Sequence, residues 1–106
     1  MTKNIAKLID NDRVAVLYSP GFGAGWYSWN LGVPEILFDP AIVKFVEHEQ
    51  MAELNTYVTL KYPGLYTGGM KDLAVAWLVV GTEFRIREHD GAESIERPND
   101  IRWITA

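Results

Sequence analysis

The chain has 106 residues, 48% of them hydrophobic and 23% charged, which is the composition of one ordinary globular domain. Its 14 acidic side chains outnumber its 10 lysines and arginines, and the net charge of −4 argues against general attraction to duplex nucleic acid. The chain contains no cysteine, which excludes disulfides, thiolate metal sites and a cysteine nucleophile, and fits a reducing compartment. No apolar run has the length of a membrane span or resembles the core of a signal peptide, so we expect a single unexported domain over residues 1–106.

The first part of the chain predicts one strand in the middle of a sheet. Residues 2–9 fit a helical turn or a short strand, and Asp10-Asn11-Asp12 then indicates a turn. The run Arg13–Ser19 is apolar on both faces, a pattern typical of a central strand. After a glycine-rich loop, Asn30–Pro34 is too broken for a helix, and Glu35–Phe38 is expected to form a short extended piece.

Two helices are predicted in the middle of the chain. The Asp-Pro pair at 39–40 marks a helix start, because the aspartate caps free N–H groups and proline at the first helical position loses no hydrogen bond. Apolar side chains then recur at helical spacing until near Gln50. A second helix is expected over Met51–Tyr62, ended by Pro63-Gly64, although the β-branched and aromatic residues 57–59 leave a strand open as the alternative.

The last third of the chain is predicted to be β-structure, after a loop at Gly64–Gly69. Apolar and charged residues alternate along Glu83–Asp90, and Asp90-Gly91 is the strongest hairpin signal in the chain. The fold class is therefore α+β: a mostly antiparallel sheet of about five strands, with two helices inserted after the first strand and packed on one face. The strands predicted in this part are Leu73–Val80, Glu83–Asp90, Glu93–Arg97 and Ile101–Thr105, with a turn at Gly81-Thr82.

The most biased stretch is residues 15–31, in which glycines at every second position are followed by a cluster of aromatic residues. It fits neither a dinucleotide fingerprint, which needs G-x-G-x-x-G opening a helix, nor a phosphate loop, which needs Gly-Lys-Ser/Thr. Successive glycine N–H groups can nonetheless hold an anion, and aromatic rings can stack on a base. The open alternative is that the glycines only turn the chain and the aromatic residues fill the core. The ligand-binding residues expected here are Phe22, Gly23, Gly25, Trp26, Trp29 and Asn30.

Two arginines form the second half of the expected binding site. Arg85 and Arg87 lie on one face of the alternating strand, where two guanidinium groups can grip a phosphate. The alternative is that they lie on a solvated sheet face and pair with Glu88, Glu93 or Glu96.

The sequence contains no recognisable catalytic or metal-binding set. The two histidines have no second ligand at metal-binding spacing, and the serines beside the glycine loop do not form a nucleophile elbow. The carboxylate pairs Glu47/Glu49 and Glu93/Glu96 are expected in solvated positions. We therefore expect a protein that is not an enzyme and that uses no metal or cofactor.

Two blocks of the sequence, taken together, resemble known proteins. They are VAVLYSPGFGAGWYSWN at 14–30, with its YSPGFGAGWYSWN core, and DLAVAWLVVGTEFRIREHDGAESI at 72–95. The chain resembles small proteins encoded by bacteriophages and prophages, and among them the phage anti-Thoeris sponges. Those are small α+β proteins that assemble into dimers or larger oligomers and sequester immune signals of the cyclic ADP-ribose type without cleaving them.

The resemblance implies a function class and leaves the binding residues to physical argument. It implies capture of a small nucleotide-derived ligand in the host cytoplasm, with no duplex nucleic acid and no membrane as partner. Because a chain of this size has little room for a deep pocket, we expect a homo-oligomer with the site between protomers. The alternative function is a protein-binding inhibitor or accessory factor whose exposed aromatic residues contact a host protein.

Overall fold

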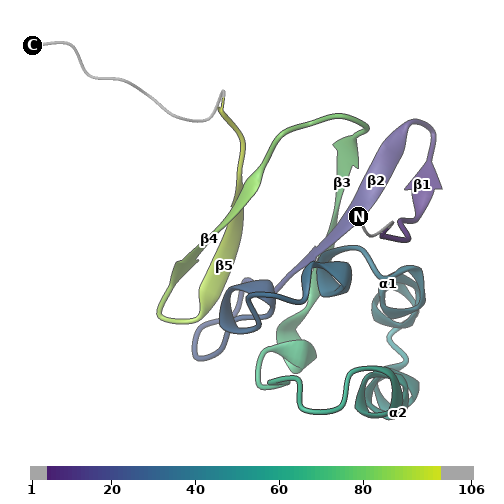
Figure 1. The fold of residues 1–106 in the computed structure, drawn as a ribbon, viewed down its shortest axis with the longest axis vertical. Coiled ribbons are helices and arrows are strands. Elements are labelled where there is room, and N and C mark those ends of the chain that lie inside the picture. The colour runs from purple at the N-terminus through teal and green to yellow at the C-terminus, as the bar shows by residue number, and fades with distance from the viewer. Residues whose placement is uncertain (1–4, 99–106) are drawn as a thin grey trace, which may run out of the picture.

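The computed structural model describes residues 5–98 and has the expected α+β architecture, with antiparallel strand pairing throughout the described part (Figure 1). The predicted strand at 101–105 lies outside the described residues. Three 3₁₀ turns connect the regular elements: η1 at Tyr27–Trp29, η2 at Pro34–Leu37 and η3 at Met70–Asp72. The strands and helices are β1 (Ile9–Asp10), β2 (Arg13–Tyr18), α1 (Pro40–Glu47), α2 (Met51–Lys61), β3 (Ala74–Val79), β4 (Arg85–His89) and β5 (Ala92–Glu96).

The first sheet has the order β1-β2-β3, which confirms that the apolar strand after Asp12 is central. β1 and β2 are joined by a tight turn in which Asn11 and Asp12 adopt positive φ angles, a conformation that Asn and Asp tolerate better than most residues. β2 and β3 pair in continuous register from Arg13 opposite Val79 to Tyr18 opposite Ala74. In the sequence, the long loop and both helices therefore come between β2 and β3, which are neighbours in the sheet.

The remaining strands of the described chain form a separate two-stranded ribbon rather than an extension of the first sheet. β4 and β5 are joined by the predicted Asp90-Gly91 turn, whose φ angles of 51° and 84° match a type I′ hairpin. Strand alternation places Arg85 and Arg87 on one face of β4, opposite Glu96 and Ser94 of β5.

The two helices form where the sequence predicted them. Asp39 accepts hydrogen bonds from the N–H groups of Ala41 and Ile42, which confirms the predicted cap. α1 ends at Glu47, before the expected Gln50, because Glu49 takes a positive φ of 56°. Residues 51–61 form a helix, so the strand alternative for this segment does not occur.

One short segment was predicted wrongly. Residues 35–38 are not extended: Pro34–Leu37 forms a 3₁₀ turn, and the Phe38 N–H donates to the Glu35 carbonyl. Pro34 opens this turn at a position where proline loses no hydrogen bond, and Ile36 and Leu37 are buried by it.

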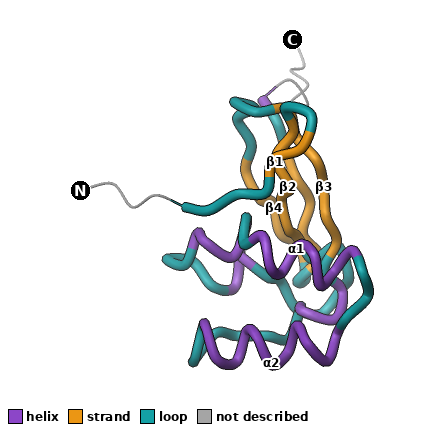
Figure 2. The backbone as a smooth tube through the Cα atoms, turned by 90° about the vertical axis from the view of Figure 1, so that its right-hand side faces the viewer, coloured by secondary structure: helices purple, strands orange, loops and turns teal. Residues whose placement is uncertain are grey.

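The hydrophobic core lies between the three-stranded sheet and the helices. Figure 2 shows α1 between the sheet and α2, and the packing of α1 against β2, β3 and α2 agrees with it. Burial of large apolar side chains is the main favourable term in such a small domain. The buried members of the core are Ala15, Leu17, Trp26, Ile36, Ile42, Val43, Leu54, Val58 and Met70.

Candidate functional site

Residues that flank the glycines hold the side-chain carboxylate of Glu93, and none of the hydrogen bonds described between this loop and Glu93 comes from a glycine N–H. The Ser19 N–H donates to Glu93 Oε1 at 2.8 Å, and the Trp26 N–H donates to Oε2 at 2.9 Å. Ser28 adds its N–H at 2.9 Å and its hydroxyl at 2.6 Å. Glu93 is only 3% exposed, so the expectation of a solvated carboxylate is wrong. The loop N–H groups of Trp26 and Ser28 are therefore already occupied by a carboxylate of the same chain.

The glycines allow this loop to pack closely against two other segments. A Cβ at Gly25 would lie 3.1 Å from Glu93 Oε2 on β5, and a Cβ at Gly69 would lie 2.6 Å from the Gly25 carbonyl oxygen. Gly23 takes a φ of 111° and donates its N–H to the Asp90 carbonyl at 2.8 Å. Gly23 and Gly25 thus serve the turn and the close packing of the loop on the hairpin.

Two of the expected ligand-binding side chains are used by the fold. Trp26 is completely buried in the core and donates its indole N–H to the Ile36 carbonyl at 2.9 Å. The Asn30 amide donates to the carbonyls of Trp26 and Tyr66, and its oxygen accepts from the Tyr66 N–H. Asn30 therefore ties two loops together with all of these polar atoms engaged.

Two other expected residues are exposed. Phe22, at the tip of the glycine loop, is 77% exposed. Trp29 is 41% exposed, and its ring lies 5.1 Å from that of Tyr66, centroid to centroid. The Trp29 indole N–H donates to Glu88 Oε2 at 3.1 Å, which fixes the plane of the ring. Trp29 thus presents a held, partly open aromatic face.

Trp29 lines a groove of about 490 Å³ between η1 and the C-terminal end of α2, here called the aromatic groove. The residues that line it are mostly apolar, and one of them, Lys61, is cationic. Such a combination suits a flat, partly apolar ligand that carries negative charge. The residues lining the aromatic groove are Trp29, Asn30, Leu31, Val33, Lys61, Tyr62, Pro63, Gly64 and Leu65.

A polar cluster fixes Lys61 at the edge of the aromatic groove. The Lys61 ammonium lies 3.3 Å from Asp39 Oδ2 and donates to the Tyr57 hydroxyl oxygen at 3.0 Å. Tyr57 and Tyr62 both donate to the Asp39 carboxylate, at 2.8 and 2.6 Å from Oδ2. The hydrogen bond to Tyr57 and the charge of Asp39 raise the pKa of Lys61, so this side chain stays protonated.

The same contacts govern Asp39. Burial alone would raise the pKa of Asp39, but the hydrogen bonds from Tyr62, Tyr57 and the Ile42 N–H, with the Lys61 charge, outweigh burial and lower it. Asp39 was predicted only as a helix cap. The sequence indicates only one part of this cluster: Tyr57 and Lys61 are four residues apart on a predicted helix and can contact each other. Their contact with Asp39 could not be predicted, because it depends on how the two helices pack.

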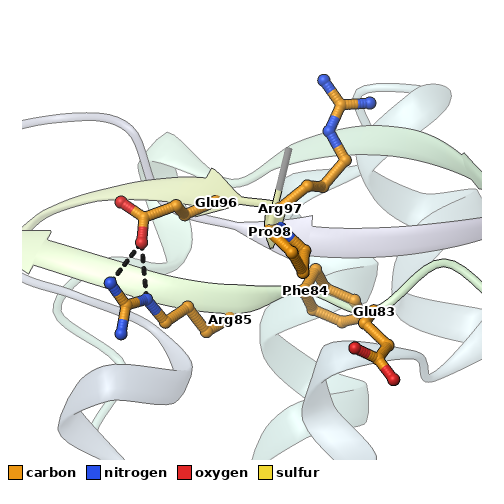
Figure 3. Close-up of a pocket in the computed structure, with 6 residues that line it drawn as sticks. All are labelled: Glu83, Phe84, Arg85, Glu96, Arg97 and Pro98. Carbon is orange, nitrogen blue, oxygen red and sulfur yellow. Dashed lines mark hydrogen bonds and ion pairs between the residues drawn. The ribbon is translucent and has the colours of Figure 1, made fainter. Parts of the chain in front are cut away.

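The expected arginines lie in a different place. Arg85 lines a second groove of about 270 Å³, here called the arginine groove, together with Glu83, Phe84, Glu96, Arg97 and Pro98 (Figure 3). The Arg85 guanidinium bonds to Glu96 Oε1, and the Arg87 guanidinium lies 3.0 Å from Glu96 Oε2. Both arginines therefore pair with Glu96, as in the alternative interpretation of the sequence.

The two expected halves of the site do not meet within one chain. Trp29 bonds to Glu88, which points to the face of β4 opposite to that of Arg85 and Arg87. The hairpin thus separates the aromatic groove from the arginines, and Lys61 is the cationic residue that lines this groove together with Trp29.

Comparison of the chain with models of protein families, with curated proteins and with solved structures finds no match. Between residues 5 and 98, neither helix is long and apolar enough to cross a membrane. In the same part of the chain, no cluster of three or more His, Asp or Glu side chains could hold a metal ion.

Proposed function

We propose that this chain is a phage-encoded counter-defence protein that binds and sequesters a cyclic nucleotide-derived signal of the cyclic ADP-ribose type, without cleaving it, in the host cytoplasm. The observation that carries the proposal is that an exposed tryptophan and a protonated lysine line the same groove. In this proposal a base stacks on Trp29, and a phosphate lies next to Lys61.

The charges around Lys61 support an anionic ligand. Its neutralising partner, Asp39, has a side chain only 2% exposed, whereas the Lys61 side chain is 54% exposed. A ligand entering from solvent therefore meets the ammonium before the carboxylate, and it does so at a lysine whose position is already fixed. Holding the cation in place before binding lowers the entropy cost of recognition.

The aromatic side of the groove supports a ligand with a flat ring. Stacking of one base on an aromatic side chain contributes about 1–3 kcal/mol. Trp29 gives up little conformational freedom on binding, because Glu88 and Tyr66 already hold its ring.

Thermal unfolding with a panel of cyclic ADP-ribose isomers, cyclic dinucleotides and cyclic trinucleotides tests this proposal. A compound present at a hundred times its dissociation constant stabilises the fold by about 2.7 kcal/mol, which raises the Tm of a domain this small by several degrees. We expect one compound to raise the Tm of the wild type, and expect Trp29→Ala and Lys61→Met to abolish most of that increase.

Two control variants locate the binding site. Lys44→Met removes an exposed lysine from α1, and Arg85→Ala/Arg87→Ala removes the charges of the second expected half-site. Both should keep the ligand-induced increase. An increase that the arginine variant loses and Lys61→Met keeps would contradict the aromatic groove.

A second candidate function is binding to a host protein. Trp29 and Tyr66 are exposed and are side chains of the kind that anchor protein interfaces. Phe22 and Leu31 are also exposed, and Leu31 lines the aromatic groove with Trp29. A panel in which no compound raises the Tm would reject nucleotide capture and favour this function.

A further inference from the structure

We infer that β3 is an interface strand, through which two copies of this chain pair edge to edge as an antiparallel dimer. The inference concerns β3 alone and does not depend on the proposed ligand. β3 lies at the edge of the three-stranded sheet, with β2 on one side, and β4 belongs to the other sheet (Figure 1).

The backbone of β3 has hydrogen-bonding groups directed away from β2. The Ala15 N–H donates to the Leu8 carbonyl, toward β1, so Ala15 and its β3 partner Trp77 do not exchange hydrogen bonds. Because the register is continuous, the N–H and C=O groups of Val75 and Trp77 both point to the outer edge. Within residues 5–98 no strand pairs with that edge.

β3 also lacks the features that protect other strand edges. Native edge strands are kept from pairing by charges, prolines, bulges or shortness. β1 has two residues, one of them Asp10, and most residues of β4 are charged or ionisable. β3 runs for six residues as AVAWLV, with no charge, proline or bulge.

The sequence of β3 is complementary to itself in an antiparallel pair centred on Ala76. Val75 then lies opposite the partner's Trp77 and can exchange both of its outward hydrogen bonds with it. Large side chains face smaller ones along this register, with Leu78 opposite the partner's Ala74, and no charge is buried. A second copy of the chain is thus a partner that can pair with the outward N–H and C=O groups of β3 and pack against its side chains.

Sedimentation velocity over a dilution series, with Val75→Pro and Val75→Thr, tests the dimer. The wild type should approach twice the chain mass of 12.0 kDa at high concentration. Val75→Pro removes an outward N–H and leaves the hydrogen bonds to β2 in place, at the cost of some core contacts of the Val75 side chain. It should sediment as a folded monomer, because proline is tolerated on a free strand edge. Val75→Thr keeps the N–H and nearly the same shape, and should remain dimeric.

Cysteine cross-linking decides the case if Val75→Pro does not fold. The chain has no cysteine, and in the proposed register two copies of Ala76→Cys face each other with Cα atoms about 4.5 Å apart, within reach of a disulfide. Ser94→Cys, exposed on β5, is the matched control. A monomeric wild type, a folded Val75→Pro dimer, or an Ala76→Cys variant that cross-links no faster than Ser94→Cys would each overturn the inference.

Discussion

Glu93 is the residue that connects the glycine loop to the rest of the molecule. A buried carboxylate is costly unless hydrogen bonds replace its lost hydration. Glu93 accepts from Ser19, Trp26 and Ser28, and its own N–H donates to the Ser19 carbonyl at 2.7 Å. These bonds join residues more than sixty positions apart, so Glu93 positions η1 and with it Trp29.

Glu93→Gln should therefore destabilise the protein. Both carboxylate oxygens of Glu93 accept hydrogen bonds. In glutamine one of these oxygens is replaced by an NH₂ group, which cannot accept a hydrogen bond. At least one buried N–H donor therefore loses its acceptor. The expected loss is about 1–3 kcal/mol in the free energy of unfolding, measured by urea denaturation. Glu88→Gln, an exposed neighbour on β4, should cost less than half as much; equal losses would contradict the role assigned to Glu93.

Asp39 makes stability depend on pH. Because its folded-state pKa lies below the ordinary value of 3.8, the unfolded chain takes up a proton first as the pH falls. The stabilisation is fully present above that ordinary value and is lost as the pH falls through the folded-state pKa. Denaturant unfolding between pH 7 and pH 3 should show a smaller loss of stability in Asp39→Asn than in the wild type, and parallel losses would contradict this assignment.

At the scale of elements, the β4–β5 turn joins the two strands of the ribbon and also packs against the glycine loop. Gly91 has a φ of 84°, and a Cβ there would overlap the backbone of Gly23 and Ala24. Gly81, in the turn after β3, has a φ of 89° but nothing within 4 Å of such a Cβ. The two glycines share their backbone conformation and differ in their surroundings.

Comparing Gly91→Ala with Gly81→Ala should therefore separate the energetic cost of close packing from the cost of backbone strain. Gly81→Ala should cost about 1 kcal/mol, the strain of an L residue at positive φ. Gly91→Ala should cost at least about 1 kcal/mol more, since the loop must also move away from the turn. Thermal and urea unfolding of both variants measure the difference, and equal costs would show that the loop does not depend on this contact.

The elements that a local signal specifies could be predicted from the sequence. Asp39 and Pro40 predicted the start of α1, and Asp90-Gly91 predicted the hairpin, because capping and turn chemistry act within a few residues. Long-range partners could not be predicted. Nothing near Glu93 in the sequence indicates that Trp26 and Ser28 will bond to it, and only the packed fold shows that Trp26 is core while Trp29 is exposed.

At the scale of the whole molecule, the expected binding residues are divided between two sides of the β4–β5 ribbon. Trp29 lines the aromatic groove with Lys61, whereas Arg85 and Arg87 pair with Glu96 on the other face. The sequence supplied the residue types that suit an anionic, flat ligand. It could not supply their arrangement, because the side of the ribbon on which the loop packs is set by the Glu93 contacts.

The proposed dimer and the proposed ligand site belong to different surfaces of the molecule. β3 pairs through its outer edge, while the aromatic groove lies between η1 and the end of α2. Val75→Pro should therefore abolish the dimer and keep a ligand-induced increase in Tm, so that failure of one proposal can be recognised without reference to the other.

The most direct measurement is a calorimetric titration of the wild type with the compound that raises its Tm most, followed by denaturation and mass analysis of the released compound. We expect saturable binding at a fixed ratio to the chain, at least tenfold weaker for Trp29→Ala, with the compound recovered intact. Recovery of a cleaved product, or equal affinity for Trp29→Ala and the wild type, would contradict sequestration in the aromatic groove.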